Sequence, residues 1–334
     1  MKEIDKIGYN IGTLLSIDHI LKFAKKIEEK ENTDSLWVPE SWGREAFVSL
    51  GALSQVTKRV RLGTAIISIH SRTPATVAMG VSTLDILSNQ RTVLGLGVST
   101  PALVENWHGG KFDNPIEKLR EYIQCIKLVM NGSKVNFEGK YYKIKDFKIL
   151  FKPSRENIPI YTAAVHKNMI DLSCEFTNGI LLYLRPKYEL PKIVKYIKNK
   201  LITSKDREKK RFEICCAFIS AVSDKDPDEA RLRAAKTLAF YVAVGKYYSK
   251  FLRQNGFDTE VQNITEEYQK NGLTNLHTFV SDNMLSALTI SGTKEECIKS
   301  LREFRESGIS LPIIQINPVG TNPENSIMEL ISTF

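Results

Sequence analysis

A regular alternation of two kinds of segment constrains the fold of this 334-residue chain most strongly. Short β-branched or apolar runs bounded by turn residues alternate with longer segments of helical period, as in chains built from βα units. The expected strands are residues 7–12, 35–39, 61–67, 92–98, 159–165, 179–184, 212–222 and 312–317. The expected helices are residues 18–30, 45–57, 74–87, 115–130, 167–176, 187–201, 228–245 and 294–305.

Eight strands and eight helices predict an α/β protein with a single (β/α)8 TIM barrel spanning residues 1–334. A doubly wound open sheet is the alternative, because strand number alone does not prove closure. Two insertions interrupt the rhythm, a β-hairpin near 134–145 and a helical excursion near 256–291. Ser16 or Asp18 is suited to begin the first helix, and Thr293 with Glu296 three residues later predicts a capping box.

Composition excludes several classes of protein. Hydrophobic residues make up 42% and charged residues 25%, as in globular domains rather than disordered chains. The apolar runs are strand-length, far below the roughly 20 residues of a membrane span. Residues 1–5 mix charges and lack a secretion signal. We therefore expect a cytoplasmic protein with no membrane partner.

The five cysteines predict neither a disulfide framework nor a metal site. They form an odd set without a Cys-x-x-Cys pair or histidines at ligand spacing, and comprise Cys125, Cys174, Cys215, Cys216 and Cys297. Cys215 and Cys216 are neighbours in an expected strand, where successive side chains point to opposite faces. We expect buried thiols and no bound metal.

Positive charge is concentrated in the middle of the chain. The net charge is +9, and residues 101–200 carry 18 basic against 10 acidic side chains. No nucleic-acid reading motif accompanies the basic stretch 134–152, so nucleic acid is the partner we expect least. The excess is either an ordinary solvated surface or a field that attracts an acidic small molecule.

The expected carboxyl ends of the strands, where a barrel places its site, carry mostly small and hydroxyl residues. Val98, Ser99 and Thr100 follow the fourth strand, and Ala164, Val165 and His166 follow the fifth. Such a lining is suited to a planar ligand held by few hydrogen bonds. Residues 95–100 (GLGVST) lack the third glycine of a dinucleotide fingerprint, and neither a phosphate-binding P-loop nor a Gly-x-Ser-x-Gly elbow occurs.

Longer motifs resemble a known family. They are LGT at 62–64, RTPA at 72–75, TLDILS at 83–88, LGLG at 94–97 and VENWHG at 104–109, with SLWVPE at 35–40, IPIY at 158–161 and SGTKEE at 291–296. Together they resemble the luciferase-like monooxygenase superfamily, particularly its branch dependent on the deazaflavin coenzyme F420. The resemblance covers nearly the whole chain and implies a (β/α)8 barrel.

The resemblance also implies how a cofactor would be held. Members have a non-prolyl cis peptide after strand three, which corresponds here to Ala65-Ile66 and would press Ile66 against the ring. Ser68 matches a hydroxyl position that hydrogen-bonds the ring, although a helix-capping serine is an alternative. The 164–166 segment matches backbone that binds the coenzyme phosphate, and helix N-termini favour anions generally. The basic middle of the chain would attract the coenzyme's phosphate and polyglutamate tail.

The catalytic residues implied by the resemblance are Glu40 and Trp42. Glu40 corresponds to the acidic member of an acid/histidine pair, and Trp42 lies near an aromatic position that stacks over the ring or closes the substrate pocket. The histidine is replaced by Ser41, and the glutamate that some relatives carry after strand four is missing. These departures argue against oxidation of an alcohol, which needs a general base, more than against hydride delivery to an activated double bond. His70 and His108 are expected to be structural, and Arg72 to tie the loop after strand three.

The sequence thus predicts an F420-dependent oxidoreductase acting on a small organic substrate, similar in type to methylenetetrahydromethanopterin reductases, with a pterin-type C1 carrier as one substrate class. An FMN-dependent monooxygenase and a cofactor-binding protein without turnover are the alternatives. Relatives commonly dimerise, and the apolar helices 45–57 and 74–87 would suit a shared face in a homodimer or higher homo-oligomer.

Overall fold

The computed structural model describes residues 6–12, 15–203 and 211–334, and it divides into two compact units. Of the described residues, the N-terminal unit comprises 11–12, 15–181, 200–203 and 211–212, and the C-terminal unit comprises 6–10, 182–199 and 213–334. The prediction of a single domain stays a prediction. Residues 1–5, which enter the expectation of a cytoplasmic protein, lie outside the described residues.

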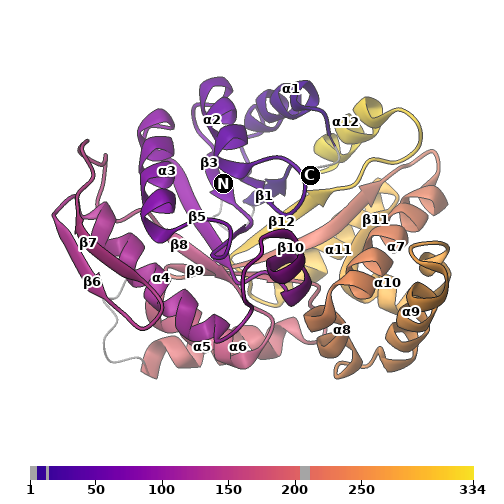
Figure 1. Ribbon diagram of the computed structural model, residues 1–334. Helices are drawn as coiled ribbons and strands as arrows, with labels where there is room; N and C mark the ends of the chain where they lie inside the picture. The colour runs from indigo at the N-terminus through magenta and orange to yellow at the C-terminus, as the bar shows by residue number, and fades with distance from the viewer. Residues whose placement is uncertain (1–5, 13–14, 204–210) are drawn as a thin grey trace. The chain divides into compact units, whose positions relative to one another are not determined.

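The N-terminal unit is built on parallel strands in the order β2-β3-β5-β8-β9. Their bounds are β2 Thr33–Val38, β3 Arg61–Thr64, β5 Thr92–Gly97, β8 Ile160–Ala163 and β9 Gly179–Tyr183, the last of which runs two residues past the unit boundary. The helices of this unit are α1 Ile17–Glu28, which precedes β2, and α2 Ala46–Val56, α3 Pro74–Leu87, α4 Pro115–Met130 and α5 Lys167–Phe176, which lie between the strands. Figure 1 shows this alternation in the indigo to magenta part of the chain.

The C-terminal unit has parallel strands in the order β11-β10-β12-β1. These are β1 Ile7–Asn10, β10 Glu213–Val222, β11 Thr289–Gly292 and β12 Leu311–Ile316, and Asn10 is the register partner of Gln315. The helices are α6 Leu190–Thr203, which runs past the unit boundary, α7 Pro227–Val244, α8 Lys246–Arg253, α9 Asp258–Asn271, α10 Asp282–Leu288, α11 Lys294–Glu306 and α12 Pro323–Thr333.

The predicted fold class is confirmed. Each of the eight expected strands is present, and with their helices they form the closed parallel sheet of a (β/α)8 barrel rather than an open doubly wound sheet. Local signals set the helix starts: Ser16 accepts a hydrogen bond from the His19 N–H at 3.2 Å, and Thr293 with Glu296 forms the expected capping box. All five cysteines are free and buried, as expected.

Both insertions lie at the expected positions in the chain, but the secondary structure of the second differs from the expectation. The hairpin consists of β6 Val135–Glu138 and β7 Lys143–Phe147. The excursion expected over 256–291 is not wholly helical, because after a 3-10 turn at Leu276–Phe279 and α10 it ends in β11, which pairs with β10. A π-helical segment at Leu103–Trp107 and the last helix α12 were not expected.

Close packing inside the N-terminal unit depends on two glycines. Trp37 and Gly63 are register partners on β2 and β3, and a β-carbon at position 63 would overlap the buried indole of Trp37. On the next strand, Gly95 both donates to and accepts from the Thr64 hydroxyl, each at 2.8 Å, and a β-carbon there would overlap the Thr64 carbonyl oxygen. The glycines let large and polar neighbours fit between the strands.

Candidate active site at the strand ends

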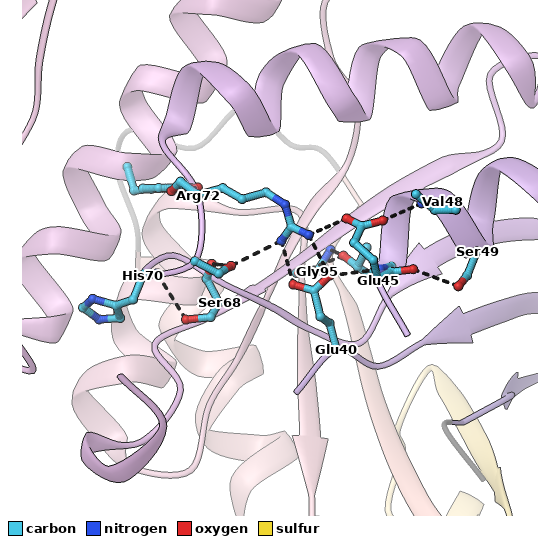
Figure 2. A network of polar contacts seen from close by, with 12 residues as sticks. Glu40, Glu45, Val48, Ser49, Ser68, His70, Arg72 and Gly95 are labelled. Atoms are coloured by element: carbon cyan, nitrogen blue, oxygen red, sulfur yellow. Dashed lines mark hydrogen bonds and ion pairs between the residues drawn. The ribbon is translucent and has the colours of Figure 1, made fainter. Parts of the chain in front are cut away.

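The loops after β2 and after the two-residue strand β4 (Ile67–Ser68) are joined by one arginine. Arg72 donates to Glu40 through Nη1 at 2.6 Å and through Nη2 at 2.8 Å, and Nη2 also donates to Glu45 (Figure 2). The two side chains of the Arg72–Glu40 pair are only 18% and 14% exposed. The expectation that Arg72 ties this loop is confirmed.

Glu40, expected to be catalytic, is held by three hydrogen bonds. Besides the two from Arg72, its Oε2 accepts from the Ala46 N–H at 2.9 Å, at the start of α2. Hydrogen bonding to Glu40 is the largest cause that raises the pKa of Arg72, which therefore stays a cation. The carboxylate is thus fixed in position, and its role in proton transfer stays a prediction.

Trp42 lies on the surface of the same loop and contacts a second tryptophan. The side chains of Trp42 and Trp107 are each 55% exposed, and their rings meet edge to face with centroids 5.3 Å apart. Trp107 ends the π-helical segment that follows β5. The sequence motif contained Trp107, but nothing in it indicated that the two indoles form a pair.

The cis peptide implied by the resemblance is present at Ala65-Ile66, between β3 and β4. The Ala65 N–H donates to the Val38 carbonyl at 2.9 Å, and the Ile66 carbonyl accepts from the Glu40 N–H at 3.3 Å. Both hydrogen bonds join the bulge to the carboxyl end of β2. A β-carbon on Gly97 of β5 would lie 2.8 Å from Ile66 Cδ1, so a glycine makes room for the isoleucine side chain.

Ser68 is buried at the end of β4, and its hydroxyl accepts from the His70 N–H at 3.1 Å. The alternative of a helix-capping serine is wrong, because Thr73 occupies the N-cap of α3 and accepts there from the Thr76 N–H. Figure 2 shows the His70 imidazole directed away from the Arg72 contacts. Its ring packs against Phe112 with centroids 5.8 Å apart.

The residues after β5 offer hydroxyl groups in an unusual backbone. Ser99 has a φ of +62°, which a non-glycine residue rarely adopts, and the buried Thr100 Oγ1 has no hydrogen-bond partner within the described ranges. Val98 is half-buried. A buried hydroxyl without a partner is costly in a folded protein, which marks Thr100 as a candidate ligand contact.

The residues after β8 lead into helix α5. Ala164 is buried and donates from its N–H to the Leu181 carbonyl at 3.3 Å, while Val165 and His166 are half-buried. His166 occupies the N-cap position, yet its side chain makes no capping hydrogen bond. The first amides of any α-helix lack partners within the helix and favour anions, and binding of the coenzyme phosphate by the 164–166 segment stays a prediction.

The predicted residues Glu40, Trp42, Ala65, Ile66, Ser68, Val98, Ser99, Thr100, Ala164, Val165 and His166 all belong to the N-terminal unit. They follow β2, β3, β5 and β8, neighbouring strands of one parallel sheet, so their strand ends meet at one edge. Within the described part of the chain, no group of three His, Cys, Asp or Glu side chains is placed to hold a metal ion. Likewise, no described helix is both long and apolar enough to cross a membrane.

Comparison of the sequence with models of known protein families shows which family this chain belongs to. The model described as luciferase-like monooxygenase matches residues 6–311. The chain belongs to the luciferase-like monooxygenase family. The resemblance inferred from the motifs is therefore confirmed.

Relatives within the luciferase-like family carry more specific names. The chain is 26% identical over 316 residues to a 5,10-methylenetetrahydromethanopterin reductase of Archaeoglobus fulgidus, covering 92% of each chain. It is 27% identical over 308 residues to a putative coenzyme F420-dependent oxidoreductase of Mycobacterium tuberculosis, covering 86% of this chain and 87% of that one. The solved F420-dependent tetrahydromethanopterin reductase of Methanopyrus kandleri has the same fold, with a TM-score of 0.83 at 20% identity over 98% and 97% of the two chains.

Proposed function

We propose that this protein is an F420-dependent oxidoreductase that moves a hydride between the deazaflavin coenzyme and a small organic substrate. The observation that carries the proposal is similarity over 86% of the chain to a relative named as a putative coenzyme F420-dependent oxidoreductase, combined with a strand-end lining of hydroxyl and small side chains. At 26–27% identity, the relatives support the cofactor class more than any one substrate. A pterin-type C1 carrier is the substrate class that their names favour.

The residues present fit this coenzyme. The buried Thr100 Oγ1, which has no partner among the described residues, offers a hydrogen bond to the polar edge of a ring system. Ser68 and Ser99 add hydroxyl groups, and Ile66 adds an apolar surface at the bulge. The N-terminus of α5 would hold the phosphate, because its first amides have no partners within the helix.

When bound, the deazaflavin ring supplies the hydride chemistry. The chain's own residues would bind and orient it: Thr100 and Ser68 by hydrogen bonds, and Ile66 as an apolar surface against the ring. Trp42 would cover the ring or the substrate and exclude water. Glu40 is the carboxylate that we propose for proton transfer, and Arg72 fixes its two oxygens.

Titration of the purified protein with F420 and, separately, with FMN tests the proposal through quenching of ligand fluorescence. We expect micromolar binding of F420 and weaker binding of FMN. Thr100→Val keeps the shape of the side chain but removes the hydroxyl, and is expected to weaken F420 binding by roughly tenfold. Thr83→Val is the matched control, since Thr83 is exposed on α3 and its hydroxyl donates to the Met79 carbonyl of the same helix.

A second candidate is an FMN-dependent monooxygenase, because the matching family is described as luciferase-like monooxygenase. Tighter binding of FMN than of F420, together with substrate-dependent oxygen consumption, would support it over the deazaflavin enzyme. Tight F420 binding without reduction of any offered substrate would instead favour a cofactor-binding protein. Failure to bind F420 at micromolar concentration would reject our proposal.

We also propose that the protein is a homodimer or higher homo-oligomer in the cytoplasm, with α2 and α3 contributing to the shared face. Val48, Met79, Ile86 and Leu87 are exposed apolar side chains on these two helices. Sedimentation velocity of the purified protein tests the oligomer, because a monomer at micromolar concentration would contradict it.

A further inference from the structure

A polar cavity of about 390 Å³ lies beside the candidate active site, within the N-terminal unit. It is lined by the loop after β4, the first turns of α4 and the tip of the β6–β7 hairpin, through Ile69, His70, Ser71, Arg72, Thr73, Lys118, Tyr141 and Tyr142. Its volume lies within the range of small-molecule sites. None of the residues implied by the family resemblance to hold the cofactor lines it.

Two lining residues carry buried polar atoms that the other described residues do not satisfy. His70 Nε2 and Tyr141 Oη both lack a hydrogen-bond partner among the described residues. They come from segments about 70 positions apart in the sequence and line the same cavity. Because a buried polar group without a partner is unfavourable, two of them around one cavity point to a polar ligand that satisfies both.

The hairpin tip is fixed in place by a carboxylate of α4. Glu121 accepts hydrogen bonds from the backbone N–H groups of Lys140, Tyr141 and Tyr142, at 2.8 to 3.1 Å. A β-carbon on Gly139 would overlap that carboxylate, so the tip approaches α4 as closely as it does because glycine is there. The cavity wall that carries Tyr141 is therefore held in place by hydrogen bonds to Glu121 and is not a loosely packed surface loop.

The cavity presents hydrogen-bond donors and no acidic side chain. Two of the eight lining residues, Arg72 and Lys118, are cations, and none is Asp or Glu. The Lys118 side chain is 17% exposed; its Nζ donates to Asp113 and to the Lys111 carbonyl, which leaves a third N–H. Lys118 and Lys140 also lie over the Tyr141 ring, with Nζ 5.8 and 5.2 Å from its centroid.

We propose that this cavity binds a carboxylate group of a small acidic molecule, which accepts hydrogen bonds from Tyr141 Oη, His70 Nε2 and Lys118 Nζ. Such a carboxylate has two sources, a free acid or the glutamyl tail of coenzyme F420. The second source rests on the proposed function, whereas the first does not.

Isothermal titration calorimetry with γ-glutamylglutamate as the probe tests the site directly on the full chain. We expect saturable binding that Tyr141→Phe weakens about tenfold and Lys118→Gln by at least as much, because both remove a donor to a charged acceptor. Lys143→Gln is the matched control: it removes a lysine from the same hairpin that is 71% exposed, pairs with Glu138 and does not line the cavity. It should bind the probe as the unmodified protein does.

A second titration separates the two sources by comparing F420 with the deazaflavin core that lacks the phosphate and the glutamyl tail. If the tail enters the cavity, Tyr141→Phe weakens binding of F420 but not of the core. If a free acid is the ligand, Tyr141→Phe weakens the binding of γ-glutamylglutamate and leaves the binding of F420 and of its core unchanged. Core binding together with unchanged affinities of F420 and the probe in both variants would overturn the inference and leave the proposed function intact. Absence of binding by F420 and its core would instead reject the proposed function, while the dipeptide titration would still decide on the cavity.

Discussion

The guanidinium of Arg72 and the carboxylate of Glu40 form two hydrogen bonds, 2.6 and 2.8 Å long, across 32 positions of sequence. This ion pair joins the loop that carries Trp42 to the loop that precedes helix α3. A substitution of Arg72 is therefore expected to change the position of the loop that carries Trp42, although Arg72 is not part of that loop.

Replacement of Arg72 by glutamine should lower the free energy of unfolding by about 2–3 kcal/mol, because two carboxylates lose their cation in a largely buried place. Urea denaturation measures this. Arg231→Gln is the matched control, since Arg231 pairs with Glu296 while both side chains are well exposed, and its effect should stay below about 1 kcal/mol. Equal losses in the two variants would contradict the structural role of Arg72.

Two glycine-to-alanine substitutions are expected to change the free energy of unfolding in opposite directions. Gly95→Ala places a methyl group against the Thr64 carbonyl and should cost about 3 kcal/mol or more, since the strands must move apart. Gly51 lies inside α2 with nothing within 4 Å of a β-carbon. Gly51→Ala should stabilise the protein by about 0.5–1 kcal/mol, because alanine favours a helix interior. Thermal and urea unfolding of both variants checks the signs.

Stability should fall as the pH drops through the ordinary range of histidine. Burial lowers the pKa of His70, the nearby Lys118 lowers it further, and Asp113 acts in the opposite sense. Just below pH 6.5 the unfolded chain therefore binds a proton at this site that the folded protein does not, so the free energy of unfolding rises with pH in that window.

Urea unfolding of His70→Gln at pH 7.5, 6.5 and 5.5 measures that contribution. The variant should lose less stability on acidification than the unmodified protein. An unchanged slope in His70→Gln would show that other groups cause the acid sensitivity.

Tryptophan fluorescence should report occupation of the candidate site. Of the three tryptophans, Trp37 is buried, while Trp42 and Trp107 form an exposed pair. Addition of F420 is expected to quench the exposed pair, and Trp42→Phe should remove most of the quenching and weaken binding several-fold. Trp107→Phe leaves the Trp42 indole in place and should keep more of both. Full quenching and affinity in Trp42→Phe would exclude a contact with the ring.

Local signals explain why so much of the barrel was predictable. Helices 74–87, 115–130 and 167–176 begin and end where expected, since proline at the first two starts and turn residues near the ends act over a few positions. The strand β11 was missed because four residues, Thr289–Gly292, carry too little pattern to separate them from the helix before.

The sequence predicted which residues belong to the candidate site, but not which of their side chains contact one another. The family motifs led to Ala65-Ile66 and to the residues after β5 and β8, because these lie at strand ends. The pairing of Arg72 with Glu40 and Glu45, the contact between Trp42 and Trp107, and the placement of Tyr141 beside His70 all depend on how loops meet in space. No period or spacing in the sequence encodes such meetings.

The fit between Trp37 and Gly63 makes two positions on neighbouring strands share one volume. In the evolution of this barrel neither position is free to change alone: a larger residue at 63 requires a smaller one at 37, and loss of the indole leaves a void that a side chain at 63 would refill. Related sequences should therefore show reciprocal sizes at these sites. A chimera that takes β2 from one relative and β3 from another will fold well only where the two sizes match.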